Sequence, residues 1–383
     1  MTVTRVLAVG HSYTLGINRA ILRELAQDDS FEITVAAPAT FHGDLRPISI
    51  EPEPAGSRLR IVPLRAYLSR WIHVFAYHPG DLNRLVRRQA YDVVHAWEEP
   101  YILSGYQIAR ATDGTSARFC FCTYQNYVKN YPFLFRHFER AVLERSDAWI
   151  TGGHLVYEAM RHKGFPAETA KFLPLSVDTS AFRPATETMR LEAQNHLGIT
   201  GPVIGYLGRF TEEKGVLLLL RVIETLGIDK PWNLLMLGSG PLEPAIRRWA
   251  ADRGITERVH IRLVKHEEVP QVLRAMDLLV APSQTTPRWR EQFGRMLIEA
   301  FAAGVPVVAS DSGEIPWVVS DAAVVVAESD VSGFTDAIRR LIDNPGERAE
   351  LVRRGLLRAE LYSSVRLARQ YAEFYRTLAG HSL

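Results

Sequence analysis

Residues 291–310 read Glu291-Gln292-Phe293-Gly294-Arg295-Met296-Leu297-Ile298-Glu299, then Ala300-Phe301-Ala302-Ala303-Gly304, then Val305-Pro306-Val307-Val308-Ala309-Ser310. Two carboxylates, Glu291 and Glu299, bracket an apolar run that predicts a helix, and the last six residues predict the strand after it. On an ideal helix the two carboxylates stand roughly 12 Å apart along the axis and differ in direction by about a quarter turn. A pair placed in this way can hold the two ends of one elongated ligand.

A glycine lies between these two acids. Phe293-Gly294 lets a ligand approach the backbone where free N–H groups begin the helix, which is a natural phosphate site. The spacing therefore suits a molecule with hydroxyls at both ends and phosphate in the middle. A nucleotide sugar has that shape.

The composition is that of an ordinary globular protein. The chain has 383 residues, of which 47% are hydrophobic and 23% charged, and this length predicts two domains. The net charge of +2 gives no indication of a nucleic-acid partner.

The two cysteines, Cys120 and Cys122, are spaced to lie on one face of a strand, so we expect buried free thiols rather than a metal or redox pair. The chain opens directly into a strand, without the features of a secretory leader. No apolar run reaches the length of a bilayer-spanning helix. We therefore expect a cytoplasmic protein, or one peripheral at the inner face of the membrane.

Strands and helices alternate through the first half. Strands are predicted over 6–9, 33–36, 91–95, 119–123, 148–151 and 172–175, helices over 17–25, 102–111 and 133–146, and a loop over 39–60. This alternation indicates a parallel sheet with ligands at the carboxyl ends of its strands. The turn after the first strand lacks the three-glycine dinucleotide fingerprint, which argues against a nicotinamide dehydrogenase.

The alternation restarts in the second half. Strands are predicted over 203–207, 234–237, 259–263, 278–283 and 305–310, and helices over 216–226, 244–253, 269–275 and the C-terminus. We predict a first domain over residues 1–177, a second over 178–362 and a terminal helix over 363–383. Both domains are expected to be doubly wound α/β units with a binding cleft between them.

Five short motifs follow one another at compatible spacing in the second half. They are Gly208-Arg209-Phe210-Thr211-Glu212-Glu213-Lys214-Gly215, Gly238-Ser239-Gly240, Pro282-Ser283, the acids Glu291 and Glu299, and residues 304–310. Together they resemble retaining glycosyltransferases of family 4, also called glycosyl transferases group 1, which have the GT-B fold. The resemblance spans nearly the whole chain, and residues 95–100, His-Ala-Trp-Glu-Glu-Pro, are similar to a bacterial subgroup. It implies two facing Rossmann-like domains, an interdomain cleft and a C-terminal helix that returns to the first domain.

The resemblance implies a donor site in the second domain. Arg209 and Lys214 would converge on a diphosphate leaving group and stabilise its growing charge, so that neither metal nor cofactor is required. No Asp-x-Asp pair lies on a plausible loop, which agrees with this expectation. The alternative is two solvated surface charges. Gly238 and Gly240 would approach the nucleotide, or else form a simple turn. The backbone near Val264 to His266 is expected at the base.

The two acids of the opening stretch also receive roles from the resemblance. Glu299 would accept hydrogen bonds from ribose hydroxyls and Glu291 from hydroxyls of the donor sugar, while Phe293 and Gly294 would offer backbone N–H groups. A carboxylate at Glu299 within an apolar helix face is costly unless it is paired, which favours a functional role.

The first domain departs from the family pattern at two points. Gly16 is expected close to the phosphates, although the common double glycine is absent, and an ordinary loop glycine is the alternative. His95 is predicted at the cleft edge, but Trp97 stands where many relatives carry a second histidine. Glu98 or Glu99 could make a polar contact or orient the acceptor hydroxyl, with a solvated loop as the alternative. Gln125 and Asn126 are further candidates on the acceptor or sugar side.

The aromatic residues after Leu64 raise the question of a membrane contact. Tyr67, Trp71 and Phe75 recur near helical spacing beside Arg65 and Arg70. Such a face could lie on an anionic membrane that carries a lipid-linked acceptor. Packing of the same aromatic side chains in the core is the alternative.

These observations predict a retaining, metal-independent glycosyltransferase. It would move a sugar from a UDP or GDP sugar to a hydroxyl of a glycan, a lipid-linked molecule or a small molecule. A nucleotide-sugar epimerase is one alternative, with Glu98 or Glu99 as acid or base. A non-catalytic nucleotide-sugar-binding module is another, suggested by Trp97 and the missing glycine. The base, donor sugar, acceptor and oligomeric state stay open.

Overall fold

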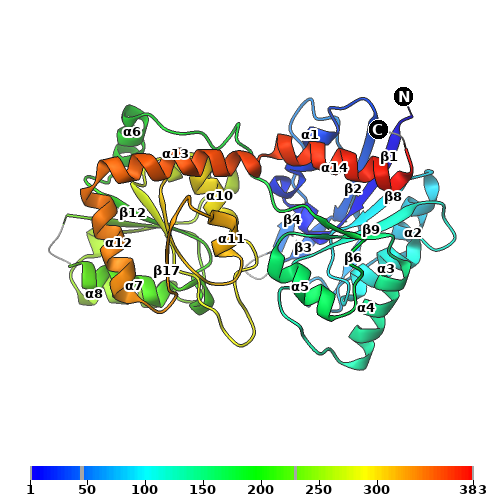
Figure 1. Cartoon of the computed structure of the whole chain (residues 1–383), viewed down its shortest axis with the longest axis horizontal. Helices are drawn as coiled ribbons and strands as arrows, with labels where there is room; N and C mark the ends of the chain where they lie inside the picture. Colours follow the sequence, from blue (N-terminus) through cyan, green and yellow to red (C-terminus); the bar gives the residue numbers. More distant parts are fainter. Residues whose placement is uncertain (1, 44–46, 228–230, 382–383) are drawn as a thin grey trace. The chain divides into compact units, whose positions relative to one another are not determined.

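The computed structural model describes residues 2–43, 47–227 and 231–381. The chain divides into two compact units, one formed by residues 1–174 with 364–383 and the other by residues 175–363 (Figure 1). The predicted crossing between residues 177 and 178 lies a few residues beyond the observed one. The loop predicted over 39–60 and the terminal helix predicted over 363–383 include residues 44–46 and 382–383, which lie outside the described residues.

The first unit is built on a seven-stranded, fully parallel sheet with the order β11-β10-β9-β8-β1-β2-β5. Its central strands are nearly continuous apolar runs, as expected of a parallel sheet that is covered on both faces. The strands are β1 (Thr4–Val9), β2 (Phe31–Pro38), β5 (Arg60–Leu64), β8 (Val93–Ala96), β9 (Arg118–Thr123), β10 (Ala148–Thr151) and β11 (Ala170–Phe172).

Helices cover both faces of this sheet. Along β9 the side chains alternate, so that Phe119 and Phe121 enter one core and Cys120 and Cys122 the other. Both cysteines are buried free thiols on the same face, which confirms the prediction for them. The helices are α1 (Ala20–Leu25), α2 (Pro79–Arg88), α3 (Leu103–Ala111), α4 (Phe133–Arg145), α5 (His154–His162) and α14 (Ser364–Ala379).

The C-terminal helix α14 completes the first unit. It packs beside α1 and over β1 and β8, and Figure 1 shows it (red) next to α1. Inside this contact the Tyr375 hydroxyl lies 2.7 Å from Nδ1 of His95. Burial lowers the pKa of His95 to about 3, so the imidazole is neutral at physiological pH. The last helix therefore supplies the hydrogen-bond partner of a histidine at the centre of the first sheet.

Several segments of the first unit differ from the prediction. Helices α2 and α5 have no predicted counterpart, and β11 ends at Phe172, where the predicted strand begins. Residues 39–60 contain the hairpin of β3 (Thr40–His42) and β4 (Pro47–Ser49), and β5 begins at Arg60. The aromatic residues after Leu64 do not lie on a helix. They belong to the hairpin of β6 (Ala66–Tyr67) and β7 (Ala76–Tyr77) and to the turn between its strands. Strands β4, β5 and β6 are short and half exposed, so they lack the continuous apolar run that is typical of the central strands.

The second unit is built on a six-stranded parallel sheet with the order β14-β13-β12-β15-β16-β17. Its strands are β12 (Val203–Leu207), β13 (Asn233–Leu237), β14 (Val259–Arg262), β15 (Leu278–Ala281), β16 (Val307–Ser310) and β17 (Val324–Val326). Its helices are α6 (Glu187–Leu197), α7 (Val216–Leu226), α8 (Glu243–Asp252), α9 (Val269–Leu273), α10 (Arg295–Ala302), α11 (Ile315–Val319), α12 (Val331–Asp343) and α13 (Pro345–Leu361).

Both sheets reverse their strand order at one place. Numbered along each unit, the first six strands of both sheets run 3-2-1-4-5-6, so the reversal falls between β1 and β8 in the first unit and between β12 and β15 in the second. The helices that follow two such neighbours pack on opposite faces: α7 belongs to one core of the second unit and α10 to the other. The carboxyl ends of these strand pairs are therefore where each sheet can hold a ligand.

The contact between His95 and Tyr375 can be tested by removing one hydroxyl. In Tyr375→Phe, the buried Nδ1 of His95 loses its partner and cannot recover by protonation, because burial opposes the charged ring. We expect the free energy of unfolding of the first unit to fall by about 1–2 kcal/mol, measured by urea denaturation.

Tyr371→Phe is the matched control. Tyr371 lies one turn earlier on α14, and its ring also faces His95, but its hydroxyl makes no hydrogen bond to the described residues. Equal losses of stability in the two variants would contradict the role assigned to the Tyr375 hydroxyl.

Candidate functional site

We call the place where the strand order of a sheet reverses its switch point. The switch point of the second unit brings together the loop after β12 and the segment after β15. Gly215 has φ of 71°, and a Cβ on this residue would lie 1.8 Å from the carbonyl oxygen of Pro282. Only glycine allows this approach. It places Lys214, the last residue of the loop, beside Ser283.

A buried carboxylate lies at this point. The ammonium of Lys214 is 2.6 Å from Oε2 of Glu291, and the Ser283 hydroxyl donates to the same oxygen at 3.0 Å. Burial by itself raises the pKa of Glu291, but the charge and hydrogen bond of Lys214, with Ser283 and the backbone of Phe293, outweigh it and lower the pKa. Glu291 is therefore an anion, and Lys214 also lies 4.7 Å from the centre of the Trp289 ring.

The structure corrects the geometry predicted for the two acids of the opening stretch. Helix α10 begins at Arg295, after Gly294 with φ of 80° and ψ of 61°, so Glu291 belongs to the preceding loop and not to the helix. Its backbone carbonyl accepts the N–H of Glu314 at 3.0 Å. Helical spacing therefore does not relate Glu291 to Glu299, and tertiary contacts position each carboxylate separately.

Glu299 has its own partner. It is buried on α10, and its Oε1 lies 2.9 Å from Nε2 of His266, which follows β14. Val264 is half-buried in the same loop. The sequence predicted a role only for the backbone of His266; a histidine a few residues after a predicted strand was the available signal.

The remaining residues predicted on the donor side surround the loop after β12. Arg209 is half exposed, and its guanidinium lies 3.4 Å from Glu213. Gly238 and Gly240 pack against residues 208–210, where Phe210 donates its N–H to the carbonyl of Ser239 at 2.9 Å. The two glycines thus hold this loop in place, whatever else they contact.

The residues predicted in the first unit separate into two groups. His95 is buried, its ring contacts Tyr371 and Tyr375 of α14, and its predicted place at a cleft edge stays a prediction. The N–H of Gly16 donates to Glu51 at 2.5 Å. Trp97 is half-buried, with its ring centre 5.1 Å from that of Tyr13. These three positions do not form a cluster of polar side chains.

The acids after β8 do form such clusters. Glu98 is buried, and its carboxylate accepts hydrogen bonds from the His11 backbone and ring and from the Tyr77 hydroxyl. The predicted alternative of a solvated loop is therefore wrong for Glu98. Glu99 accepts from the Thr123 hydroxyl at 2.5 Å and the Tyr124 N–H at 2.8 Å, and burial raises its pKa.

Two further predicted residues lie nearby in sequence. Gln125 and Asn126 are both buried after β9, and the Gln125 amide donates to the carbonyl of Tyr127.

His11 was missed by sequence reasoning, although a histidine directly after the first strand of a parallel sheet is a detectable signal.

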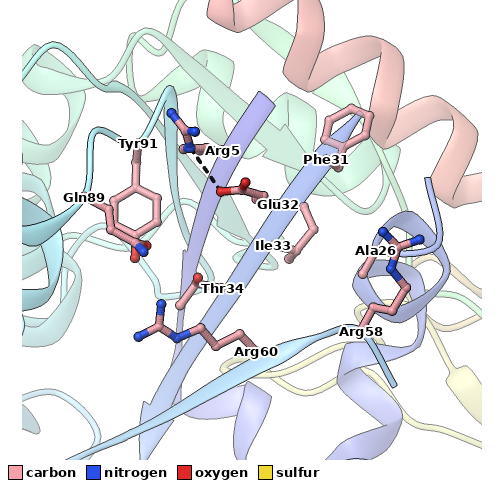
Figure 2. A pocket seen from close by; sticks show the side chains of 10 residues that line it. All are labelled: Arg5, Ala26, Phe31, Glu32, Ile33, Thr34, Arg58, Arg60, Gln89 and Tyr91. Atoms are coloured by element: carbon pink, nitrogen blue, oxygen red, sulfur yellow. Dashed lines mark hydrogen bonds and ion pairs between the residues drawn. The ribbon is translucent and has the colours of Figure 1, made fainter. Parts of the chain in front are cut away.

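One pocket of about 260 Å³ lies elsewhere in the first unit (Figure 2). Its lining includes Arg5, Glu32, Arg60 and Tyr91, which lie at or before the amino ends of β1, β2, β5 and β8. Arg5 and Glu32 form an ion pair across it at 3.0 Å. None of the predicted site residues lines this pocket. It lies at the amino ends of the strands, whereas the switch point of the first unit lies at the carboxyl ends of β1 and β8.

Two absences hold for residues 2–43, 47–227 and 231–381. No group of three or more His, Cys, Asp or Glu side chains in these ranges is arranged to hold a metal ion. No helix in them is long and apolar enough to cross a bilayer.

Two family models together match most of the chain. The model for Glycosyl transferases group 1 matches residues 190–358, and that for Glycosyltransferase Family 4 matches residues 18–181. The chain belongs to glycosyltransferase family 4. The resemblance inferred from the five motifs is thereby confirmed.

Curated members of the family match this chain over part of its length. A GDP-mannose-dependent monoacylated alpha-(1-6)-phosphatidylinositol monomannoside mannosyltransferase of Corynebacterium glutamicum is 33% identical over 48% of this chain and 49% of its own. A GDP-mannose-dependent alpha-(1-6)-phosphatidylinositol monomannoside mannosyltransferase of Mycolicibacterium smegmatis is 32% identical over 54% of this chain and 59% of its own. The matched part is thus about half to three-fifths of these relatives.

Solved structures establish the fold of this family member. A glycosyltransferase of Rickettsia africae superposes with a TM-score of 0.79 at 16% identity, covering 100% of both chains. Anabaena Alr3699/HepE, solved in complex with UDP, gives 0.73 at 16% identity over 98% of this chain and 100% of its own. The chain therefore has the two-domain α/β architecture called GT-B, as predicted.

The pair of Lys214 and Glu291 makes a prediction about stability. In Lys214→Met the buried carboxylate of Glu291 loses its cationic partner. We therefore expect the free energy of unfolding at pH 7 to fall by about 3 kcal/mol. Because the folded pKa of Glu291 is lowered, the contribution of the pair is present above the ordinary pKa of a glutamate and is lost as the pH falls through the folded value. The difference from wild type should therefore shrink as the pH falls below the ordinary glutamate value of 4.5 in urea titrations.

Arg247→Met provides the control. Arg247 forms an exposed pair with Glu243 on α8, and such a pair contributes about 0.5 kcal/mol or less. A Lys214→Met variant as stable as Arg247→Met at pH 7 would contradict the account of the buried pair.

Proposed function

We propose that this family member is a retaining, metal-independent glycosyltransferase that moves a sugar from a UDP or GDP sugar to a hydroxyl acceptor. The observation that carries the proposal is the cluster at the second switch point, where Lys214, Glu291 and Ser283 meet at the carboxyl ends of β12 and β15. A cation and a carboxylate held at this place suit the phosphate and the sugar hydroxyls of one donor.

The chemistry asked of these residues is mainly electrostatic. Arg209 and Lys214 would stabilise the diphosphate as the glycosidic bond breaks and its electrons move to the phosphate oxygen. The diphosphate would replace Glu291 as the partner of Lys214. Glu291 would then accept hydrogen bonds from sugar hydroxyls. Glu299 and His266, which bind each other without a ligand, are the proposed ribose contacts.

Retention is proposed from the family, and a front-side displacement needs no protein nucleophile. The relatives support a sugar nucleotide as donor: two are named as GDP-mannose-dependent, and one solved structure contains UDP. Neither of these relatives is an epimerase, and no observation favours that alternative.

Nucleotide binding tests the donor site directly. We expect one of the UDP, GDP or ADP sugars to raise the melting temperature of the wild type by mass action, and Arg209→Ala to lose most of that shift. Arg209 suits this test because its half-exposed side chain can be removed without breaking the buried pair of Lys214 and Glu291. Sugar transfer should persist in excess chelator, and NMR of the product should show a retained anomeric configuration.

Arg247→Ala is the control for charge removal, since Arg247 lies on α8 in an exposed pair. A full thermal shift in Arg209→Ala would remove Arg209 from the site, and complete loss of transfer in chelator would contradict metal independence.

We also propose a peripheral membrane contact through an apolar patch on the first unit. The patch comprises the exposed side chains of Tyr67, Leu68, Trp71, Phe133 and Leu134, of which Trp71 is 61% and Phe133 78% exposed. The turn that holds Trp71 and the first turn of α4 are neighbours, because the rings of His73 and Phe135 lie 5.8 Å apart. Exposed aromatic side chains of this kind suit the interface of a bilayer.

The patch predicts binding to anionic vesicles. The double variant Trp71→Ser with Phe133→Ser should sediment less with phosphatidylglycerol vesicles than the wild type, by roughly tenfold in apparent affinity, because two large apolar groups no longer insert. Trp317→Ser is the control, since Trp317 is 56% exposed in the second unit. Equal sedimentation of the wild type and the double variant would contradict the proposed contact.

A further inference from the structure

The switch point of the first unit carries a histidine and a glutamate that the proposed donor site does not use. His11 follows β1 and Glu98 follows β8, and the two meet because these strands are neighbours in the sheet. Oε2 of Glu98 lies 2.6 Å from Nδ1 of His11. Oε1 accepts the backbone N–H of His11 at 2.7 Å and the hydroxyl of Tyr77 at 2.9 Å.

Glu98 determines which ring nitrogen of His11 carries the proton. A carboxylate only accepts hydrogen bonds, so Nδ1 must be the donor and Nε2 of the neutral ring has a lone pair. Phe41 stacks on the ring at 4.8 Å between centres, and Phe75 contacts its edge. Nε2 makes no hydrogen bond to the described residues, and the side chain of His11 is 24% exposed, so this nitrogen is accessible to a ligand.

The surroundings of His11 are acidic. The titratable groups that face it or share its carboxylate are Glu98 and Glu99 after β8, Tyr77 on β7 and Tyr13 after β1. Burial alone would lower the pKa of His11, but the charge and hydrogen bond of Glu98, with a contribution from Glu99, raise it. Such surroundings disfavour an anionic ligand and favour hydroxyl groups on an uncharged or cationic one.

We propose that Nε2 of His11 accepts a hydrogen bond from a hydroxyl of the sugar acceptor, and that Glu98 positions the ring for this contact. The inference rests on the transferase function proposed above and adds the chemistry of the acceptor. That acceptor is a polyol or amino-substituted polyol, uncharged or cationic where it meets His11. The half-buried Trp97, between Tyr13 and Tyr124, offers an aromatic face beside the same loop.

The variant His11→Asn isolates the proposed contact. Its amide can still donate to Glu98, but it has no atom at the position of Nε2. With the donor identified by the nucleotide panel and myo-inositol, 2-deoxystreptamine or methyl α-D-mannopyranoside as acceptor probe, we expect the acceptor KM to rise by roughly tenfold. The thermal shift by the nucleotide should not change. An unchanged acceptor KM would overturn the proposal while leaving the transferase function intact.

The pH profile distinguishes a positioning role of Glu98 from a merely structural one. The contact needs neutral His11, so the acceptor kcat/KM should rise with pH through the raised pKa of His11. In Glu98→Gln the carboxylate charge is gone, and this acid limb should move to lower pH. A loss of activity that is equal at every pH would contradict the positioning role.

Imidazole ¹⁵N NMR tests the contact even where turnover is absent. In histidine-labelled protein, neutral His11 should show a protonated Nδ1, and its Nε2 resonance should shift when methyl α-D-mannopyranoside, myo-inositol or 2-deoxystreptamine is added. No shift with any of the three would overturn the proposal. If no nucleotide stabilises the wild type, the proposed function fails separately, and the NMR titration alone decides the inference.

Discussion

The reversal of strand order in each parallel sheet is the constraint on which the candidate sites depend. Strands β12 and β15 are neighbours, yet the helices that follow them pack on opposite faces, so the carboxyl ends of this pair are left uncovered. The same holds for β1 and β8, whose following helices α1 and α3 enter different cores of the first unit. Backbone N–H groups and loop side chains converge at these two places.

Both places hold a buried carboxylate whose cost of burial is offset by donors around it. Glu291 is held by Lys214 and Ser283, and Glu98 by His11 and Tyr77. A buried charge persists only where such partners exist. Partners that stabilise the carboxylate without a ligand are also the groups a ligand can engage, which makes these pairs suitable for recognising phosphate and hydroxyl groups.

Much of the fold could be predicted because central parallel strands are local, continuous apolar runs. The bounds predicted for β12 (203–207), α7 (216–226) and β10 (148–151) are those observed. Edge strands such as β5 could not be predicted in this way, because they are half exposed and lack such a run. The motif loops of the candidate site could be predicted from the sequence. The contacts of His266 and His11 could not, because their carboxylate partners, Glu299 and Glu98, are distant along the chain.

The sequence by itself determined the family, the parallel α/β character of both units and the residue types of the loop after β12, since each depends on local patterns of apolar residues, glycines and charges. Tertiary structure decided the rest. Gly294 in a left-handed conformation begins α10 after Glu291, so the two acids of residues 291–299 do not share a helix. Strand order alone places His11 against Glu98, and α14 buries His95. No local pattern can express such contacts, because they join residues that are distant along the chain and adjacent only in the folded sheet.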